Sequence, residues 1–233
     1  MGKAEKEIYR NELAKRQQVI KDANLPVIVI LEGWGAAGKG SALGSIIKYM
    51  DPRFFKVYNM DVISEDEKRK PFLYRHAVKM PEYGQFSFFD GGVMDEVTKL
   101  YLHGEIDRDE YDRRIESIVH YERQLRDNGY LVVKFFLKVD KKTQKERLDK
   151  LADGKHTKWR VSKDDLWQNK HYSKCEKLYE EYIKLHSLNI YGRTLVKLPL
   201  PQYIVFYNGN DSRPDLYELK LSDSFECDSD AIN

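Results

Sequence analysis

Short apolar runs alternate along the chain with longer stretches in which apolar residues recur at helical spacing. Residues 27–31 form a continuous run of valine, isoleucine and leucine, typical of a strand that is buried on both faces of a parallel sheet. Further apolar runs predict strands over residues 55–59, 85–89, 130–139 and 203–207. The pattern therefore predicts a sheet built from these segments.

The intervening amphipathic stretches predict helices. They cover residues 3–22, the segment from the glycine-rich region to about residue 50, and residues 64–79, 93–102, 108–127, 141–151 and 164–187. Ser64 is a candidate N-cap, because Glu67 follows at the spacing of a capping box. Strands that alternate with helices indicate an α/β fold with a mostly parallel sheet, and right-handed crossovers would put helices on both of its faces.

Composition and charge exclude several classes of protein. The 233 residues are 41% hydrophobic and 12% aromatic, which is enough for the core of one domain or of one domain with an appendage. No apolar run approaches the roughly 18 to 20 residues of a membrane-spanning helix, so no membrane role is expected. The net charge of +2 argues against a nucleic-acid coat protein, and any site for a polyanion must be a local patch.

The cysteines and the N-terminus give no sign of export. Cys175 lies in a helical pattern and Cys227 in an acidic tail, and their spacing fits neither a disulfide framework nor a metal site. The first ten residues contain no apolar signal region. We therefore expect a cytoplasmic protein.

The strongest motif is the glycine-rich segment at residues 33–40, G-W-G-A-A-G-K-G. It fits the phosphate-loop pattern G-x-x-x-x-G-K and lies between a predicted buried strand and a helix, as that motif requires. Inward-turned N–H groups and the positive end of the helix would hold phosphate oxygens, and Lys39 would reach the terminal phosphates. The candidate phosphate-binding residues are Gly33, Gly35, Ala36, Ala37, Gly38, Lys39, Gly40 and Ser41.

The motif leaves the position of a magnesium ion open. Its eighth residue is Gly40, where such loops usually carry a serine or threonine that holds Mg²⁺. Ser41 is next to it, but one residue along a helix turns a side chain by about 100°. Asp90 ends the strand predicted at residues 85–89, and an aspartate there is the usual second anchor for magnesium. The alternative is that Asp90 only caps the following turn.

A first group of basic residues lies in the helix predicted at residues 64–79. Lys68, Arg75 and Lys79 can share one face at helical spacing and form part of a track for phosphates. Arg75 stands between large apolar neighbours, so we expect it to point into the site as a catalytic residue. The alternative for the other cations is an ordinary solvated helix face.

A second group of basic residues lies between two predicted helices. Lys155, Lys158 and Arg160 occupy the position at which nucleotide kinases carry a mobile lid. Cations on such a lid would close over the transferring phosphates and exclude water. The alternative is a basic surface loop without a ligand.

Taken in order, these segments resemble the polyphosphate kinase 2 family, which includes the polyphosphate:AMP phosphotransferases. The loop L-E-G-W-G-A-A-G-K-G is similar to the family's E-G-W-D-A-A-G-K-G, including the glycine after the lysine. The resemblance continues through D-P-R at residues 51–53, P-F-L-Y-R at 71–75, K-F-F-L at 134–137 and W-R-V-S with a following aspartate at 159–165. It runs from about residue 25 to 210.

The resemblance implies phosphoryl transfer between inorganic polyphosphate and a nucleotide, with Mg²⁺ or Mn²⁺ as the cofactor. It also implies a three-layer P-loop kinase fold with a helical lid. Carried over by position, the phosphate-contacting lysine is Lys39, the metal-binding carboxylate is Asp90 and the lid cation is Arg160, with Arg75 as a further phosphate ligand. The acceptor would be AMP, ADP or a guanine nucleotide, and the family suggests a homo-oligomer.

Two departures from the family pattern keep other functions open. Gly35 stands where the family loop has an aspartate, and Gly91-Gly92-Val93 where the family has arginine, serine and tryptophan. Asp61 and Asp95 are candidates to replace the missing metal ligand. The main expectation is a polyphosphate-dependent nucleotide phosphotransferase. The alternatives are a degenerate family member that binds polyphosphate or nucleotide as a non-catalytic partner, and an ATP-using small-molecule or nucleoside kinase.

The expected organisation has three parts. Residues 1–24 form an N-terminal helix, and residues 25–220 form the phosphotransferase domain with a lid at about 152–165. Residues 221–233 are acidic and serine-rich and are expected to be a disordered tail.

Overall fold

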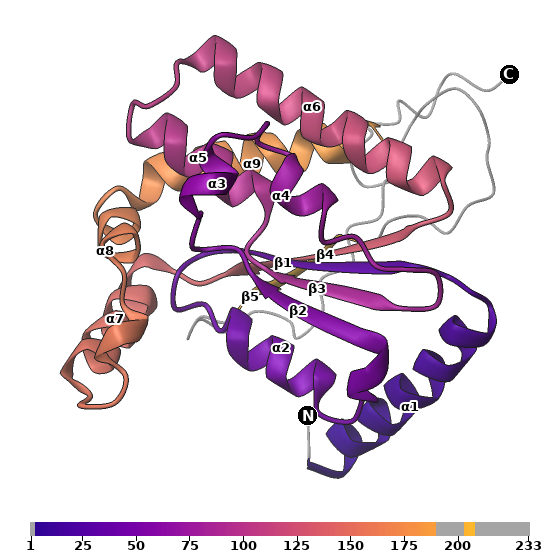
Figure 1. The fold of residues 1–233 in the computed structure, drawn as a ribbon. Helices are drawn as coiled ribbons and strands as arrows, with labels where there is room; N and C mark the ends of the chain where they lie inside the picture. Colours follow the sequence, from indigo (N-terminus) through magenta and orange to yellow (C-terminus); the bar gives the residue numbers. More distant parts are fainter. Residues whose placement is uncertain (1–2, 190–202, 208–233) are drawn as a thin grey trace, which may run out of the picture.

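The centre of the molecule is a parallel sheet (Figure 1). The computed structural model describes residues 3–189 and 203–207, and within these ranges five strands pair in the order β2-β3-β1-β4-β5. The strands are β1 (Val27–Gly33), β2 (Phe55–Asn59), β3 (Phe86–Asp90), β4 (Leu131–Lys138) and β5 (Tyr203–Tyr207). Each lies where the apolar runs predicted it, and the parallel sheet expected from the sequence is confirmed.

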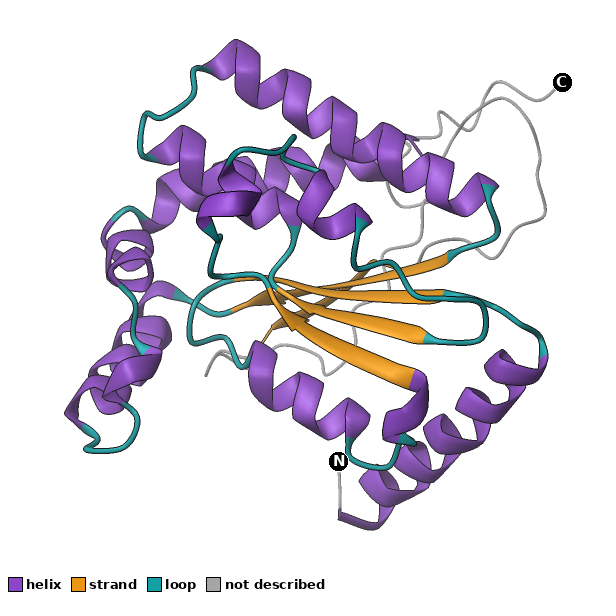
Figure 2. Ribbon diagram, viewed as in Figure 1, coloured by secondary structure: helices purple, strands orange, loops and turns teal. Residues whose placement is uncertain are grey.

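Helices cover both faces of the sheet, which gives three layers (Figure 2). One face carries α3 (Glu65–Lys68), α4 (Tyr74–Ala77), α5 (Val93–Leu102), α6 (Arg108–Asp127) and α9 (Tyr172–Asn189), and the other carries α1 (Lys3–Asp22) and α2 (Lys39–Ile47). An arm at one side is formed by α7 (Lys141–Asp153), the short 3-10 helix η2 (Lys158–Arg160) and α8 (Lys163–Lys170). A further 3-10 turn, η1 (Pro52–Phe54), precedes β2. The α/β architecture with a helical arm agrees with the sequence-based expectation.

The central strand β1 divides the core in two. All seven of its residues are buried, as expected of a strand with a helical layer on each side. Val27, Val29 and Leu31 pack with α1 and α2, whereas Ile28 and Ile30 pack on the opposite side, with Phe89 of β3. This alternation is the period of two that a strand imposes on its side chains.

The N-terminal helix is attached to the body by both apolar and polar contacts. Leu13 and Ile20 of α1 pack on the cluster formed by β1 and α2. The Gln17 amide donates to the Asp51 carbonyl at 3.1 Å and accepts from the Asp51 N–H at 2.8 Å. Because Gln17 is buried, these bonds fix the helix against the turn that precedes β2.

The prediction of one continuous helix over residues 64–79 is wrong. The structure has α3 and α4 instead, with Pro71 between them. Proline has no N–H to donate and disfavours a helical conformation in the preceding residue, so the helix ends before it. The capping box at Ser64 and Glu67 is present. Lys68, Arg75 and Lys79 therefore do not share the face of one helix.

The helix predicted at residues 164–187 is also divided. It is interrupted at His171, between α8 and α9. Tyr172 stacks on Trp34 of the glycine-rich loop, and its hydroxyl donates to the Val139 carbonyl at 2.9 Å. These tertiary contacts fix the start of α9 against the body and leave α8 to continue into the arm.

The acidic tail expected at residues 221–233 lies outside the described residues. Across residues 3–189 and 203–207, none of the helices has the length and apolar character that crossing a bilayer requires.

Candidate active site

The glycine-rich loop connects β1 to α2 at the carboxyl edge of the sheet (Figure 1). Gly38 is the N-cap of α2 with a φ of 102°, and Ala36 has a φ of 54°. A left-handed backbone is unfavourable for alanine, and such strain is found mainly where a structure holds a ligand. Successive turns of this kind direct N–H groups into one concave surface, which suits an anion.

Trp34 anchors the loop to the helical layer. Its side chain is fully buried, and its ring stacks on Tyr172 at 4.1 Å and meets Tyr179 edge-on at 5.2 Å. The indole N–H has no hydrogen-bond partner. The tryptophan therefore contributes packing alone, and it ties the loop to α9.

Lys39 lies at the first position of α2, and its ammonium group folds back over the loop. The Nζ atom donates to the carbonyls of Gly33 at 3.0 Å and Trp34 at 3.1 Å. Ala37 is buried below the loop, whereas Gly40 and Ser41 are exposed on the first turn of α2. The loop thus combines a cation with exposed positions at a helix N-terminus.

Carboxylates gather around this lysine at the ends of neighbouring strands. Asp90 ends β3, beside Leu31 of β1 in the sheet register. Asp95, in the first turn of α5, accepts a hydrogen bond from the Gly33 N–H at 3.2 Å. Burial raises the pKa of Asp90, the charges of Asp61 and Asp95 raise it further, and Lys39 opposes the shift. The structure therefore brings Lys39 and three carboxylates to one edge of the sheet.

This donor set fits a magnesium ion accompanied by phosphate. The described residues contain no group of three or more histidine, cysteine, aspartate or glutamate side chains that could hold a metal by themselves. Mg²⁺, however, usually takes only one or two carboxylates and completes its shell with water and phosphate. Asp90 and Asp61 belong to adjacent strand ends, and Asp61 Oδ1 would lie 3.6 Å from a Cβ at Gly91. Burial is the main cause of the raised pKa of Asp90, and the charge of Asp61 adds to it, so a cation beside Asp90 would favour its ionised form.

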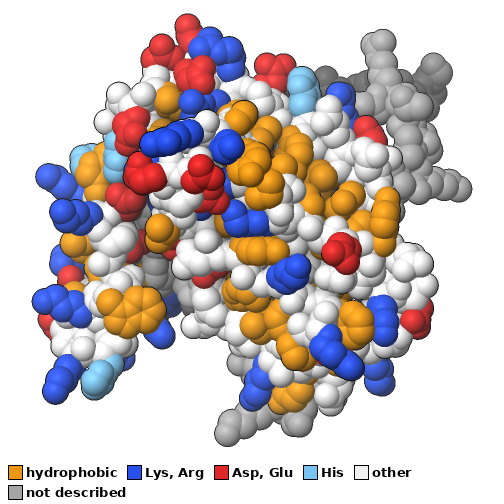
Figure 3. Space-filling view, viewed as in Figure 1, with side chains coloured by type: hydrophobic (Ala, Val, Ile, Leu, Met, Phe, Trp, Pro, Cys, Tyr) orange, Lys and Arg blue, Asp and Glu red, His pale blue; other side chains and the backbone are white. Residues whose placement is uncertain are grey.

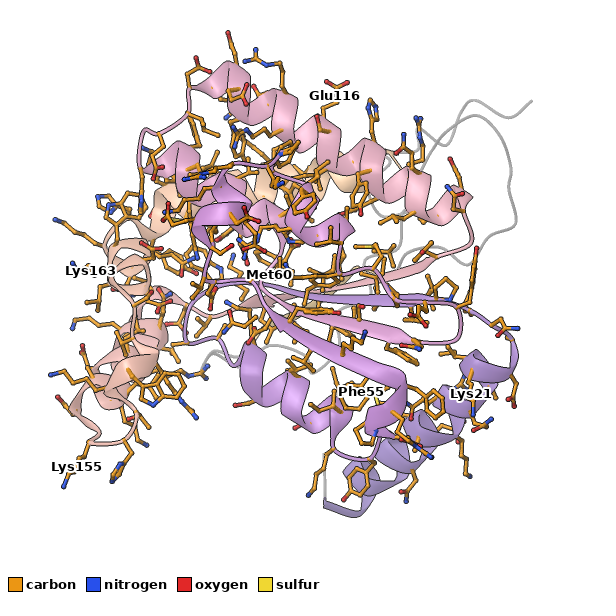
Figure 4. All side chains as sticks on the ribbon, in the orientation of Figure 1. Lys21, Phe55, Met60, Glu116, Lys155 and Lys163 are labelled. Atoms are coloured by element: carbon orange, nitrogen blue, oxygen red, sulfur yellow. The ribbon has the colours of Figure 1, made fainter. Side chains whose placement is uncertain are left out.

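Arg75 is buried beside this edge, with 4% of its side chain exposed. Its guanidinium donates to the carbonyls of Met60 at 3.0 Å and Val62 at 2.8 Å, and it pairs with Glu96 at 3.1 Å. Figure 4 labels Met60 at the centre of the molecule, next to the strand ends. Arg75 thus ties the segment after β2 to α5, and its role toward phosphate stays a prediction.

The other two cations of this region differ in their surroundings. Lys79 donates to Glu67 at 2.8 Å and to the Arg75 carbonyl at 2.8 Å. The hydrogen bond from Lys79 lowers the pKa of Glu67 to about 2. Lys68 is exposed and pairs with Glu65 at 2.6 Å. Lys79 is therefore part of the network around Arg75, whereas Lys68 points to solvent.

The predicted lid corresponds to the outer part of the arm. Lys155, Lys158 and Arg160 are all exposed, and the Arg160 guanidinium lies 5.3 Å from the ring centre of Trp159. Figure 3 shows lysine and arginine side chains along the arm, and Figure 4 labels Lys155 at its outer end. The arm is thus a basic surface on one side of the loop.

The inner part of the arm grips the glycine-rich loop through amide side chains. Gln168 of α8 accepts from the Gly35 N–H at 2.8 Å, and Gln144 of α7 donates to the Gly35 carbonyl at 3.1 Å. The Gln144 amide also donates to Gln168 at 2.9 Å, and Arg147 donates to the Ala36 carbonyl at 3.3 Å. The arm and the loop therefore form one hydrogen-bonded unit.

Both departures from the family pattern have a steric counterpart. A Cβ added at Gly35 would overlap the carboxylate of Asp165, whose Cγ would lie only 2.9 Å away. A Cβ at Gly92 would overlap Glu32, whose Cγ would lie 2.6 Å away. A carboxylate of another element therefore lies directly against each glycine in this structure.

Glu32 belongs to a buried ionic network below the loop. Lys134 of β4 lies 3.4 Å from Glu32 and 2.7 Å from Glu122, and it also donates to the Tyr182 hydroxyl. Burial raises the pKa of Glu32 to about 7, the nearby Asp95 adds to the shift, and Lys134 opposes it. Around neutral pH this network therefore gains or loses a proton.

Several residues of the site were not identified from the sequence. Asp165 was noted only as part of the family resemblance, and no role was assigned to Gln144, Gln168 or Glu32. Amide side chains on amphipathic helices carry no recognisable spacing, and only the folded arrangement shows that they meet the loop. For Glu32, a charged residue at the end of an otherwise apolar strand was the available signal.

Curated relatives of this chain are phosphotransferases that use polyphosphate. A protein from Pseudomonas syringae pv. tomato named polyphosphate:AMP phosphotransferase is 30% identical over 172 residues, which are 71% of this chain and 34% of that protein. A Meiothermus ruber protein named AMP/ADP-polyphosphate phosphotransferase is 24% identical, covering 76% of this chain and 67% of its own length. The chain spans about a third of the length of the Pseudomonas relatives that it matches.

Solved structures show the same fold. The crystal structure of polyphosphate kinase 2 from Arthrobacter aurescens TC1 aligns with a TM-score of 0.74 at 23% identity, over 86% of this chain and 69% of that chain. Residues 1–197 match the family described as Polyphosphate kinase 2 (PPK2). The P-loop kinase fold is thereby confirmed, and the chain belongs to the polyphosphate kinase 2 family.

Proposed function

We propose that this chain transfers phosphoryl groups between inorganic polyphosphate and a nucleoside mono- or diphosphate. The observation that carries the proposal is the position of Lys39, which lies in a strained phosphate loop and acts on both Asp90 and Asp95. The names of relatives, which include acceptors such as AMP and ADP, support it. Since the chain spans only about a third of the first relatives, the activity of the whole protein is part of the proposal.

The loop and its lysine would hold the phosphate that moves. Backbone N–H groups at the start of α2 bind phosphate oxygens. Lys39 leaves the Gly33 and Trp34 carbonyls and binds the negative charge that develops on the transferred phosphate. An oxygen of the acceptor's terminal phosphate attacks the terminal phosphorus of polyphosphate. The bond from that phosphorus to its bridging oxygen breaks, and the polyphosphate becomes one phosphate shorter.

The carboxylates and the lid would complete the site. Asp90 and Asp61 would hold Mg²⁺, which when bound would neutralise charge on the phosphate oxygens. Lys155, Lys158 and Arg160 approach the chain of phosphates from the arm and exclude water from the transferred group. Arg75 and Lys79 fix the segment that carries Asp61, through the Met60 and Val62 carbonyls and Glu67.

A non-catalytic binding function is the second candidate. It is favoured by the segment after Asp90, where Gly91 and Gly92 offer no cation to the transferring phosphate. A positive group at that position is worth orders of magnitude in rate. In this case the loop and the lid would bind polyphosphate or nucleotide without turnover.

One assay separates these functions. Phosphorylation of AMP, ADP and GDP from long-chain polyphosphate is measured in parallel with Mg²⁺ and with Mn²⁺, and Lys39→Ala is the control for contaminating kinases. Turnover that is lost in Lys39→Ala supports the proposed transfer and names the acceptor. Polyphosphate binding without turnover supports the binding function. ATP consumption without dependence on polyphosphate would contradict both and favour a small-molecule or nucleoside kinase.

A further inference from the structure

The hydroxyl group of Tyr179 lies where the phosphate loop, the arm and the helical layer meet. Tyr179 belongs to α9, and only 4% of the residue is exposed. Its ring centre lies 5.2 Å from that of Trp34 in the loop and 5.1 Å from that of Phe136 in β4. In such apolar surroundings a hydroxyl group must find its hydrogen-bond partners within the protein.

One partner of this hydroxyl is Gln168 in the inner part of the arm. Gln168 Nε2 donates to the Tyr179 oxygen at 3.1 Å, while Gln168 Oε1 accepts from the Gly35 N–H at 2.8 Å. Gln144 donates to the same Oε1 at 2.9 Å and to the Gly35 carbonyl at 3.1 Å. The reverse orientation of the Gln168 amide would set its NH₂ group against the Gly35 N–H, donor against donor. Tyr179 therefore supports the orientation in which Gln168 holds the loop.

The other partner is the carboxylate of Asp95 in α5. Asp95 is buried and accepts from the Gly33 N–H at 3.2 Å. Burial raises the pKa of Tyr179 well above its usual value, and the charge of Asp95 and the hydrogen bond to it raise that pKa further. Tyr179 thus keeps its proton and donates it to Asp95, while its oxygen accepts from Gln168. A single hydroxyl can do both, because it offers one donor and two acceptor sites.

We propose that Tyr179 is a positioning residue whose hydroxyl group couples the arm to the phosphate loop. On one side it holds Gln168, which binds the peptide of Gly35, and on the other it holds Asp95, which binds Gly33. Docking of the arm and the shape of the loop then depend on each other through this one group. The catalytic consequence rests on the proposed function, whereas the coupling between arm and loop does not.

Tyr179→Phe tests the coupling, since it removes the hydroxyl group and keeps the ring. Hydrogen exchange of the α8 amides at residues 163–170, measured by mass spectrometry, should become about tenfold faster, because the buried Gln168 amide loses its partner. Tyr111→Phe is the matched control. Tyr111 is also buried in the same apolar cluster, but its hydroxyl pairs with Thr98 of α5. The control should leave exchange in α8 within about threefold of the original rate.

A second variant separates this coupling from a general loss of stability. Gln168→Ala removes the arm's contact with the hydroxyl and keeps a residue that favours a helix. In the Gln168→Ala background, Tyr179→Phe should change exchange in α8 by less than about threefold, because the hydroxyl no longer has an arm residue to hold. Two results would overturn the coupling. One is equal exchange of α8 in Tyr179→Phe and Tyr111→Phe, and the other is a tenfold effect of Tyr179→Phe that persists in the Gln168→Ala background.

Turnover tests the catalytic consequence. The kcat of Tyr179→Phe for nucleotide phosphorylation should fall by about tenfold or more, because the loop holds the transferred phosphate less exactly. The KM for long-chain polyphosphate should stay within about threefold of the original value, since the exposed cations Lys155, Lys158 and Arg160 are unchanged. A kcat equal to that of Tyr111→Phe would contradict the positioning role. If the unsubstituted protein transfers no phosphate, the proposed function fails, and the exchange measurements still test the coupling.

Discussion

The carboxylate of Glu32 lies against the Cα of Gly92, so that Glu32 Cγ would stand 2.6 Å from a Cβ at that position. Glu32 ends the apolar part of β1 and Gly92 precedes α5, so this contact joins the phosphate loop to the helical layer. Lys134 binds Glu32 from the other side, at 3.4 Å. The N-terminus of α5 thus packs directly against the buried Glu32 carboxylate.

Gly92→Ala should therefore destabilise the fold. The added methyl group must displace a buried carboxylate, and overpacking of this kind costs about 1 to 3 kcal/mol. Urea unfolding compared with Gly44→Ala is the measurement, since that change meets open space within α2 and should stabilise a helix by up to about 1 kcal/mol. Equal stability of the two variants would contradict the steric account.

Glu32→Gln should alter how stability depends on pH. Folding raises the pKa of Glu32 from its ordinary value of 4.5 to about 7, chiefly by burial, so the folded protein takes up a proton between these pH values. The stabilisation from this proton is complete below pH 4.5 and is lost as the pH rises through 7. Relative to the variant, the original protein should lose about 3 kcal/mol of unfolding free energy between pH 4.5 and pH 8. Urea midpoints across this range measure the effect, and parallel pH profiles would refute it.

Arg75→Ala should reduce stability whether or not Arg75 also contacts phosphate. Its guanidinium is 4% exposed and binds Glu96 and two carbonyls, and removal of one partner from a buried pair costs about 3 to 5 kcal/mol. Thermal unfolding and polyphosphate binding are measured on the same variant. If stability is unchanged and binding or turnover is lost, Arg75 is a phosphate ligand, as the sequence predicts, and not a support of the fold.

His76→Phe should stabilise the protein, most strongly in mild acid. Both ring nitrogens are buried without a partner, and burial lowers the pKa of His76 to about 3. Between about pH 3 and pH 6.5, His76 is protonated in the unfolded chain but not in the folded chain. The free energy of unfolding therefore falls as the pH drops from about 6.5 toward 3. Phenylalanine removes this pH-dependent loss and should raise the free energy of unfolding by about 1 to 3 kcal/mol at neutral pH.

The His76 ring lines a small apolar cavity with Met80 and Leu125, and this cavity can accept the extra volume of phenylalanine. Melting temperatures at pH 5 and pH 7 test both parts.

Replacement of Lys155, Lys158 and Arg160 together by alanine should weaken polyphosphate binding without weakening the fold. The three side chains are exposed, so the melting temperature should stay nearly constant. The KM for long-chain polyphosphate should rise by about tenfold or more and depend less on salt. Lys142→Ala is the control, because Lys142 is also exposed on α7. An unchanged KM would show that the basic arm is only a solvated surface.

The sequence predicted those parts of the fold that local patterns determine. The apolar runs of β1 and β4, and the cap at Ser64, carry their structure within a few residues. The divisions at Pro71 and His171 escaped prediction for different reasons. Proline acts locally and could have been weighed, whereas the turn at His171 depends on the contact of Tyr172 with Trp34, which is distant in the chain.

The residues of the site also fall into those that local patterns identify and those that only the folded structure shows. Lys39 and Asp90 were identified because a motif and a strand end mark them, and the structure brings them together. The carboxylates of Asp165 and Glu32 lie against Gly35 and Gly92. Contacts of this kind exist only between elements that meet in three dimensions, so a glycine in a sequence does not reveal which side chain lies against it.

The register of β1 has a consequence for the order in which the protein folds. Val27 pairs with Phe86 on one side and with Leu131 on the other, so both neighbours of the central strand are supplied by later parts of the chain. β4 must therefore be synthesised before β1 can pair with a strand on each side. Contacts between such distant segments form slowly, and until then a strand of continuous apolar residues remains open to other chains.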